Sequence, residues 1–421
     1  MRKEKLLMII TAMLIPLTSK VFAADRYWTA SGSGNWSDGK NWSETSGGNP
    51  CDTLPESGDN IFFDDKGQGV CSVDKTADNI GSITITEGHT GKITQSTNLT
   101  VSGDFSHSGA AIWDTAECNL TVGVDFTITN SAVVNTGIKS QFYFYGNYTA
   151  KQKSRFTGWH GETVTFCGKG TKTYTQEFPS EGFSFSKVVI GGGEDRRLDI
   201  SGTMRALSLQ VKTGTIGGTG TIVFYNPNKD CYRYSGATWA DSVNVCMSAP
   251  GKNSTAVVPG GRYPNLFFTA CCTYTTSGPI ECAQLSIDCQ EDNAWTILDT
   301  GGLPLTFKDL RLGNKGSKVR QSALDCREST VKCSGTIYID DENSCISCGK
   351  STFILTGENT LPSGEVVQPT KFYNLVVSGK TTLSADCIVE NDLTVEKGAV
   401  LDCAGYKLIV NGTKKVLGEL K

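Results

Sequence analysis

The stretch FYNLVVSGKTTLSADCIVENDLTVEKGAV, residues 372–400, contains the pattern that decides the fold of this chain. Short runs such as Leu393-Thr-Val395 alternate apolar with small polar residues, and Gly, Asn, Asp, Ser or Thr bound them. When apolar residues recur at every second position, one face of the strand packs inward and the other face is in water. The stretch therefore predicts short, half-buried β-strands joined by tight turns.

The same arrangement returns elsewhere in the chain. Phe372 opens a run that is followed 21 residues later by Leu393, and Phe185 opens one that is followed 24 residues later by Leu209. A looser copy begins at Tyr263. Gly398 and Gly214 each come three residues after a run, where a corner needs positive φ or close packing. Repeats of about 20 residues with such corners predict an all-β, parallel β-helix, or β-solenoid.

Tandem β-sandwiches are the alternative fold, because they also contain alternating strands and frequent turns. Their hairpins favour Asn-Gly or Asp-Gly turns. The chain has one of each, at Asn411-Gly412 and Asp38-Gly39. Hairpins can use other turns, so the sandwich stays open while the solenoid is favoured.

Composition narrows the possible functions. The 421 residues include 47 Gly but only 3 His, and charged residues make up 19% with a formal charge of -4. This composition is typical of a globular chain, and the negative charge argues against a nucleic-acid partner. Mechanisms that need several histidines are nearly excluded.

Residues 1–23 have the features of a secretory signal peptide. Arg2, Lys3 and Lys5 precede an apolar run from Leu6 to Leu17, and cleavage is expected after Ala23. No second apolar run of bilayer length follows, so we expect a mature chain without a transmembrane span. The expected location is extracellular or at the cell surface.

Sixteen cysteines in an exported chain predict disulfides. The best candidates, neighbours across turn-like loops, are Cys51 with Cys71 and Cys231 with Cys246. The alternative is a zinc site, whose four ligands would be Cys326, Cys333, Cys345 and Cys348.

The start of the mature chain carries a more specific motif. Tyr27-Trp28, Gly34-Asn35-Trp36, Asn41-Trp42-Ser43, Ser46-Gly47-Gly48 and Asp59 to Asp64 follow one another. This series resembles the opening module of secreted bacterial surface proteins of the adhesin-like or autotransporter-passenger-like β-solenoid type. The resemblance implies a surface location and a repetitive β-helical shape.

Two interpretations of the Trp-rich segment follow, and they differ in where the rings lie. A first solenoid coil exposes strand edges, so residues 24–70 are expected to form a cap in front of a solenoid at 71–421. Alternatively, Trp28, Trp36 and Trp42 form an exposed platform on which sugar rings stack.

Asn, Pro and Gly-rich turns at about 226–262 predict a lateral excursion from the solenoid.

No pattern in the sequence points to catalysis. Glycoside hydrolysis needs two carboxyls facing one sugar bond, but neighbouring acids on a strand, such as Asp64-Asp65, face opposite ways. The composition of Glu194 to Arg197 is the nearest in this chain to that of a lyase site. Asp340 to Asn343 supplies oxygen ligands of the kind found in a calcium-binding loop. We expect a non-enzymatic structural or adhesive protein without metal or cofactor, whose partners are surface glycans or proteins. A carbohydrate-binding module is the alternative, and a β-helical lyase or glycosidase a weaker one.

Overall fold

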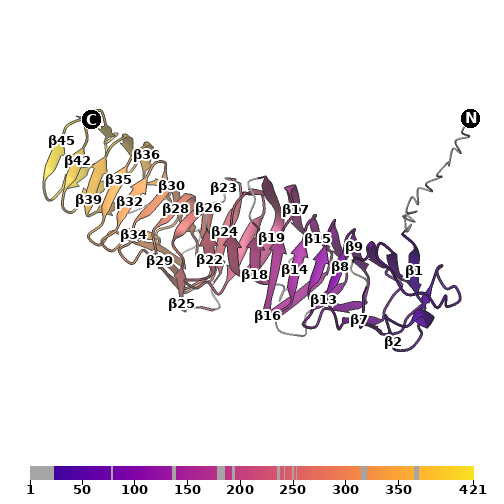
Figure 1. The fold of residues 1–421 in the computed structure, drawn as a ribbon. Helices are drawn as coiled ribbons and strands as arrows, with labels where there is room; N and C mark the ends of the chain where they lie inside the picture. Colours follow the sequence, from indigo (N-terminus) through magenta and orange to yellow (C-terminus); the bar gives the residue numbers. More distant parts are fainter. Residues whose placement is uncertain are drawn as a thin grey trace, which may run out of the picture.

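The chain winds into an elongated β-solenoid of about 15 turns in a computed structural model (Figure 1). The structure describes residues 23–421 except 77–78, 135–138, 178–184, 192–194, 235–237, 241, 249–250, 253, 314–319 and 365–368. The predicted signal peptide at 1–23 therefore lies outside the described residues apart from Ala23. Among these residues the one helix is a 3₁₀ turn, η1 (Gly39–Asn41).

Parallel strands stacked coil on coil form the faces of the solenoid. The first face contains β1 (Asp25–Trp28), β4 (Asn60–Phe63), β6 (Ser82–Ile85), β9 (Phe105–Ser108), β12 (Phe126–Thr129), β15 (Tyr148–Lys151), β17 (Gly170–Gln176), β19 (Arg196–Val211), β20 (Thr215–Gly218) and β23 (Thr238–Trp239). The second face contains β2 (Gly34–Asn35), β5 (Cys71–Val73), β7 (Lys92–Gln95), β10 (Ile112–Asp114), β13 (Ala132–Val134) and β16 (Arg155–Phe166).

The third face continues to the C-terminal end of the rod. It contains β8 (Leu99–Val101), β11 (Leu120–Val122), β14 (Gln141–Phe144), β18 (Phe185–Ile190), β21 (Thr221–Tyr225), β22 (Tyr232–Tyr234), β24 (Asn244–Ser248), β26 (Gly261–Phe268), β28 (Ile280–Ile287), β30 (Leu305–Leu312), β32 (Thr330–Cys333), β33 (Ile337–Ile339), β35 (Thr352–Leu355), β37 (Ser363–Gly364), β39 (Asn374–Val377), β42 (Leu393–Val395) and β45 (Lys414–Val416). The long strands β16 and β19 bend around corners and also belong to this face.

Three further sheets complete the coils of the C-terminal half. The fourth face contains β25 (Thr255–Val258), β27 (Thr273–Thr276), β29 (Ala294–Asp299), β31 (Arg320–Asp325) and β34 (Cys345–Ser347). The last two sheets contain β36 (Glu358–Leu361), β40 (Lys380–Leu383), β43 (Val400–Asp402) and β46 (Glu419–Leu420), and β38 (Thr370–Phe372), β41 (Cys387–Val389) and β44 (Leu408–Val410).

Strand direction rules out the sandwich alternative. Within the described part of the chain, the one antiparallel pair joins β1 to β3 (Trp42–Ser43), and the other ladders are parallel. Sandwich sheets are built from antiparallel strands. The predicted all-β solenoid is therefore confirmed, and Gly214 and Gly398 adopt the expected positive φ at 103° and 82°.

Inward-facing side chains form one continuous core along the rod. One cluster of buried apolar residues extends from Trp28 to Leu401. Aromatic rings from successive coils stack within it: Phe105, Phe126, Tyr148 and Tyr174 have centroid spacings of 5.2, 5.3 and 5.0 Å and nearly parallel planes. Parallel in-register pairing places equivalent side chains directly above one another, so each coil extends the core of the one before it.

Polar side chains at the corners connect the same coils. Asp125 Oδ1 accepts a hydrogen bond of 2.8 Å from the backbone N–H of Asn147, and Asn147 Oδ1 accepts one of 2.9 Å from that of Thr173. Asn98 and Asn119 begin a similar row on another corner. The Asn and Asp residues that bound the strands thus satisfy backbone donors that the turns leave unpaired.

A lateral excursion was expected at about 226–262, and strands occupy part of the described residues of this segment. There β22, β24 and β26 continue the parallel pairing of the third face. Asn226 has a φ of 58° and turns the chain at a corner. Residues 235–237, 241, 249–250 and 253 lie outside the described residues, so the lateral excursion stays a prediction.

Candidate functional site

The three tryptophans of the N-terminal segment converge at the first end of the rod. Trp28 lies on β1, Trp42 on β3, and Trp36 directly follows β2. The Trp42 ring packs edge-on against both others, with centroids 5.2 Å from Trp28 and 4.8 Å from Trp36. Phe63 of β4 contacts all three rings. The aromatic cluster covers the apolar end of the first coil.

This burial contradicts the exposed sugar platform. Trp28, Trp36 and Trp42 are each no more than 1% exposed, so none presents a ring face to a sugar. The cause is the antiparallel β1–β3 pair, which folds Trp42 back over Trp28, its partner in the register. Sequence alone could not distinguish a buried cluster from a platform, because both require large rings between small residues.

The indole nitrogens differ in how they are satisfied. Trp28 Nε1 donates to the carbonyl of Gly69 at 3.2 Å, and Trp42 Nε1 donates to the carbonyl of Trp36 at 2.8 Å. Trp36 Nε1 is buried and has no hydrogen-bond partner. Such an orphaned donor is uncommon, because a buried N–H without a partner destabilises a fold by about 1–3 kcal/mol.

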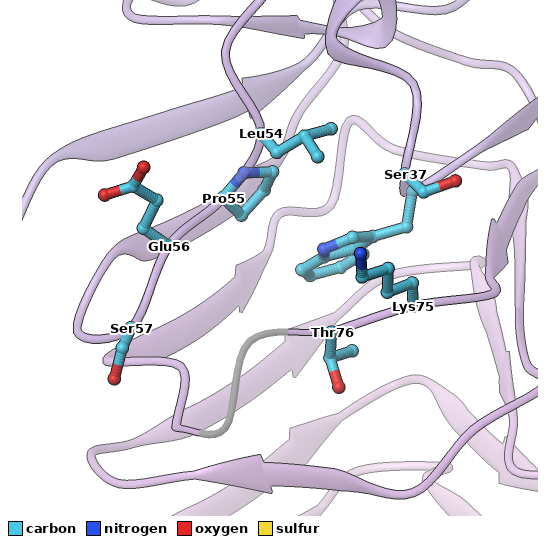
Figure 2. A pocket seen from close by; sticks show the side chains of 8 residues that line it. Ser37, Leu54, Pro55, Glu56, Ser57, Lys75 and Thr76 are labelled. Atoms are coloured by element: carbon cyan, nitrogen blue, oxygen red, sulfur yellow. The ribbon is translucent and has the colours of Figure 1, made fainter.

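Trp36 also lines a cavity of about 430 Å³ beside the cluster (Figure 2). Figure 2 shows Leu54 and Pro55 on one side of this cap cavity and Lys75 and Thr76 on the other. Ser37, Glu56 and Ser57 complete its wall. The volume is within the range of small-molecule sites, and an apolar wall with a few polar groups is typical of them.

Hydrogen bonds fix one side of the cap cavity. The backbone N–H and the hydroxyl of Ser37 both donate to the Asp74 carboxylate, at 2.9 and 2.5 Å. Burial raises the pKa of Asp74, but these hydrogen bonds outweigh it and leave the pKa below its usual value. Among the described residues neither Lys75 nor Glu56 forms an ion pair, so both charges are available to a ligand.

Sequence reasoning missed most of this cavity. Leu54 to Ser57 lie in a loop within the segment expected to form the cap, and Lys75 and Thr76 lie beyond its boundary at residue 70. Of the residues that line the cavity, the quoted opening motif contains Trp36. The cavity exists because the loop before β4 and the segment after β5 meet beside Trp36, which only the coil geometry reveals.

Two buried histidines, His89 and His107, lie on the two coils that follow the coil of Phe63. His89 is in contact with Phe63 at a ring-centroid distance of 5.3 Å, and His107 faces inward on β9. Both side chains are fully buried, and their ring nitrogens have no hydrogen-bond partner. Burial lowers the pKa of His89, and it lowers the pKa of His107 to about 4.

In this structure the predicted pairs, Cys51 with Cys71 and Cys231 with Cys246, are not joined by disulfide bonds. Cys231 is buried in the core. Cys246 alternates with the buried Val245 and Met247 and therefore faces outward, so the two thiols lie on opposite faces of the β-sheet. Cys71 faces inward on β5, while the Cys51 thiol lies against the carbonyl of Thr53 in its own loop.

The alternative sites considered from the sequence are not assembled in the described residues either. No three His, Cys, Asp or Glu side chains converge within the described residues, so Cys326, Cys333, Cys345 and Cys348 do not form a zinc cluster. Asp340 pairs with Arg311, and Asp341 accepts from Ser344 Oγ at 2.9 Å. Glu194 lies outside the described residues.

Comparison with protein-family models, curated proteins and solved structures finds no significant match to this chain. In the part of the chain that the structure describes, no helix is long and apolar enough to cross a membrane.

Proposed function

We propose that this protein is a non-enzymatic extracellular rod with a structural or adhesive role at the cell surface. A β-solenoid of this kind is typical of structural and surface proteins. The observation that carries the proposal is the uninterrupted core from Trp28 to Leu401, which makes one stiff body of the stacked coils.

The outer surface suits repeated weak contacts. Outward positions on successive strands hold Thr or Ser in rows, as in the paired Thr100 and Thr121 or the paired Ser106, Thr127 and Thr149. Rows of this kind offer equivalent contacts at each coil. Weak contacts add through multivalency when they are held on one rigid body, so the fold needs no single deep site for adhesion.

Surface display and lack of turnover are tested together. We expect protease or antibody added to intact source cells to reach the protein, and we expect the purified mature chain to leave plant, microbial and host polysaccharides intact with or without calcium. Turnover of any polysaccharide that is lost in Asp195→Asn would contradict the proposal. Retention of the protein inside the cells would contradict its location.

The cap cavity supports a second candidate function, binding of a small sugar unit. A sugar hydroxyl can accept from the Lys75 ammonium, which lines the cavity, while the sugar ring lies against Leu54 and Pro55. This replaces the exposed platform by a pocket beside the buried tryptophans. A mixed apolar and hydrogen-bonding wall fits the amphipathic surface of a pyranose.

Lys75→Met is the variant that tests this function, because it keeps an unbranched side chain of similar length and removes the charged donor. Against a panel of mono- and disaccharides in calorimetry, we expect the dissociation constant of the best ligand to rise about 5- to 30-fold, the effect of one lost hydrogen bond. Lys332→Met makes the same change on an exposed residue of β32 and should leave binding unaltered. If the wild-type chain binds no member of the panel, the cavity is not a sugar site.

A further inference from the structure

Two cysteines on neighbouring coils meet at one corner of the rod. Cys271 lies in the turn between β26 and β27, and Cys289 lies in the turn between β28 and β29, one coil further on. Their Sγ atoms are 3.2 Å apart. This is closer than a relaxed contact of two sulfurs and about 1.2 Å longer than a disulfide bond, so a small rotation of the side chains closes the gap.

The surroundings isolate this pair from the other thiols. Cys271, Cys289 and Ala294 form a small buried cluster separate from the main core. The adjacent Cys272 faces the other way and is part of the main core. The pairs that sequence spacing suggested have no comparable contact, since the Cys246 thiol lies against the hydroxyl of Thr269.

We propose that Cys271 and Cys289 form a disulfide that connects two successive coils of the solenoid. This inference rests on the proposed export, because such bonds persist in oxidising compartments. The reaction is a thiol–disulfide exchange. One cysteine thiolate attacks the disulfide of a thiol oxidoreductase, and the second then displaces it from the mixed disulfide. The two cysteines lose two protons and two electrons, and the electrons reduce the oxidoreductase disulfide to a dithiol.

The bond has to form before this corner is completed. Both side chains are at most 3% exposed, which leaves no path for an oxidoreductase in the folded protein. Burial and the neighbouring Cys289 sulfur also raise the pKa of Cys271 to about 11, so little thiolate is present near neutral pH. The same burial protects the finished disulfide from reductants. The disulfide therefore forms during folding and then holds the two coils together.

The experiment uses the full mature chain in two preparations. One is purified from the medium or surface of the source cells, and the other is unfolded with reductant and refolded with a mixture of reduced and oxidised glutathione. Free thiols are blocked, the chain is digested without reduction, and the peptides are mapped by mass spectrometry. We expect a peptide linking Cys271 to Cys289, lighter by two hydrogen atoms than its reduced halves. Dithiothreitol should break the link in urea but leave it intact in native buffer.

Matched variants make the outcome decisive. Cys272→Ser should retain the link, whereas Cys271→Ser should abolish it and leave Cys289 blocked as a free thiol. Free thiols at both positions in the refolded wild-type chain would overturn the proposal. A link in the refolded chain but free thiols in the cell-derived chain would support the pairing and contradict the proposed export instead.

Discussion

Replacing Trp42 by Ala lowers the free energy of unfolding by about 3–5 kcal/mol, the range for removing a large buried aromatic side chain. The ring contacts Trp28, Trp36 and Phe63, and its indole N–H satisfies the carbonyl of Trp36. Chemical denaturation followed by circular dichroism measures the loss. Because each coil is stabilised mainly by its neighbours, the damage should stay near the N-terminal end of the rod.

Hydrogen exchange locates this damage. In Trp42→Ala we expect faster exchange over residues 25–73, with little change in β39 and later strands. Trp295→Ala is the control, because Trp295 is 37% exposed and its removal leaves no enclosed cavity. A loss below about 1 kcal/mol in Trp42→Ala would show that the aromatic cluster does not close the end of the core.

Acid weakens the wild-type fold between about pH 6.5 and pH 4, and His107→Ile removes most of that dependence. The unfolded chain binds a proton at His107 near pH 6.5, whereas burial keeps the folded pKa at about 4. Stability contributed by neutral His107 is therefore complete above pH 6.5 and is lost as the pH falls to about 4. A shift of this size corresponds to roughly 3 kcal/mol.

Isoleucine suits this position because of the register. His107 is paired with Ile85 in the coil before it and with Ile128 in the coil after it, so the substitution completes an apolar row. It also removes two buried nitrogens without partners, and we expect about 1–3 kcal/mol of added stability at pH 7.5. Urea unfolding at pH 7.5 and pH 4.5 measures both effects.

A second substitution in the same row serves as the control. Ile85→Val changes the core without a titratable group, so its effect should be equal at the two pH values. His89 is also buried, and the lowering of its pKa acts in the same direction, which leaves a smaller acid dependence in His107→Ile. If His107→Ile retained the full wild-type slope between the two pH values, His107 would not be the residue that couples acid to unfolding.

The candidate site shows where sequence reasoning reached its limit. The rings of the Trp-rich motif are buried rather than exposed, and the cap cavity includes Lys75 and Thr76, beyond the expected boundary. The cysteines are similar. Their number predicted disulfides, but proximity along the chain suggested Cys231 with Cys246, whereas stacking brings Cys271 to Cys289. Residues about 20 positions apart are neighbours on successive coils only if they occupy equivalent positions in the repeat, so sequence separation alone is a poor guide to contact.

The sequence by itself determined the all-β class, the coil repeat and the Gly corners. Alternation and backbone freedom are local properties, readable from Leu393 to Gly398 without knowledge of any partner. Only the tertiary structure decided which wall each thiol faces, that Trp42 folds back over Trp28, and that Trp36 Nε1 is left without an acceptor beside a cavity. These features depend on the register between coils, which is set by core packing over the whole stack and which no single stretch of sequence records.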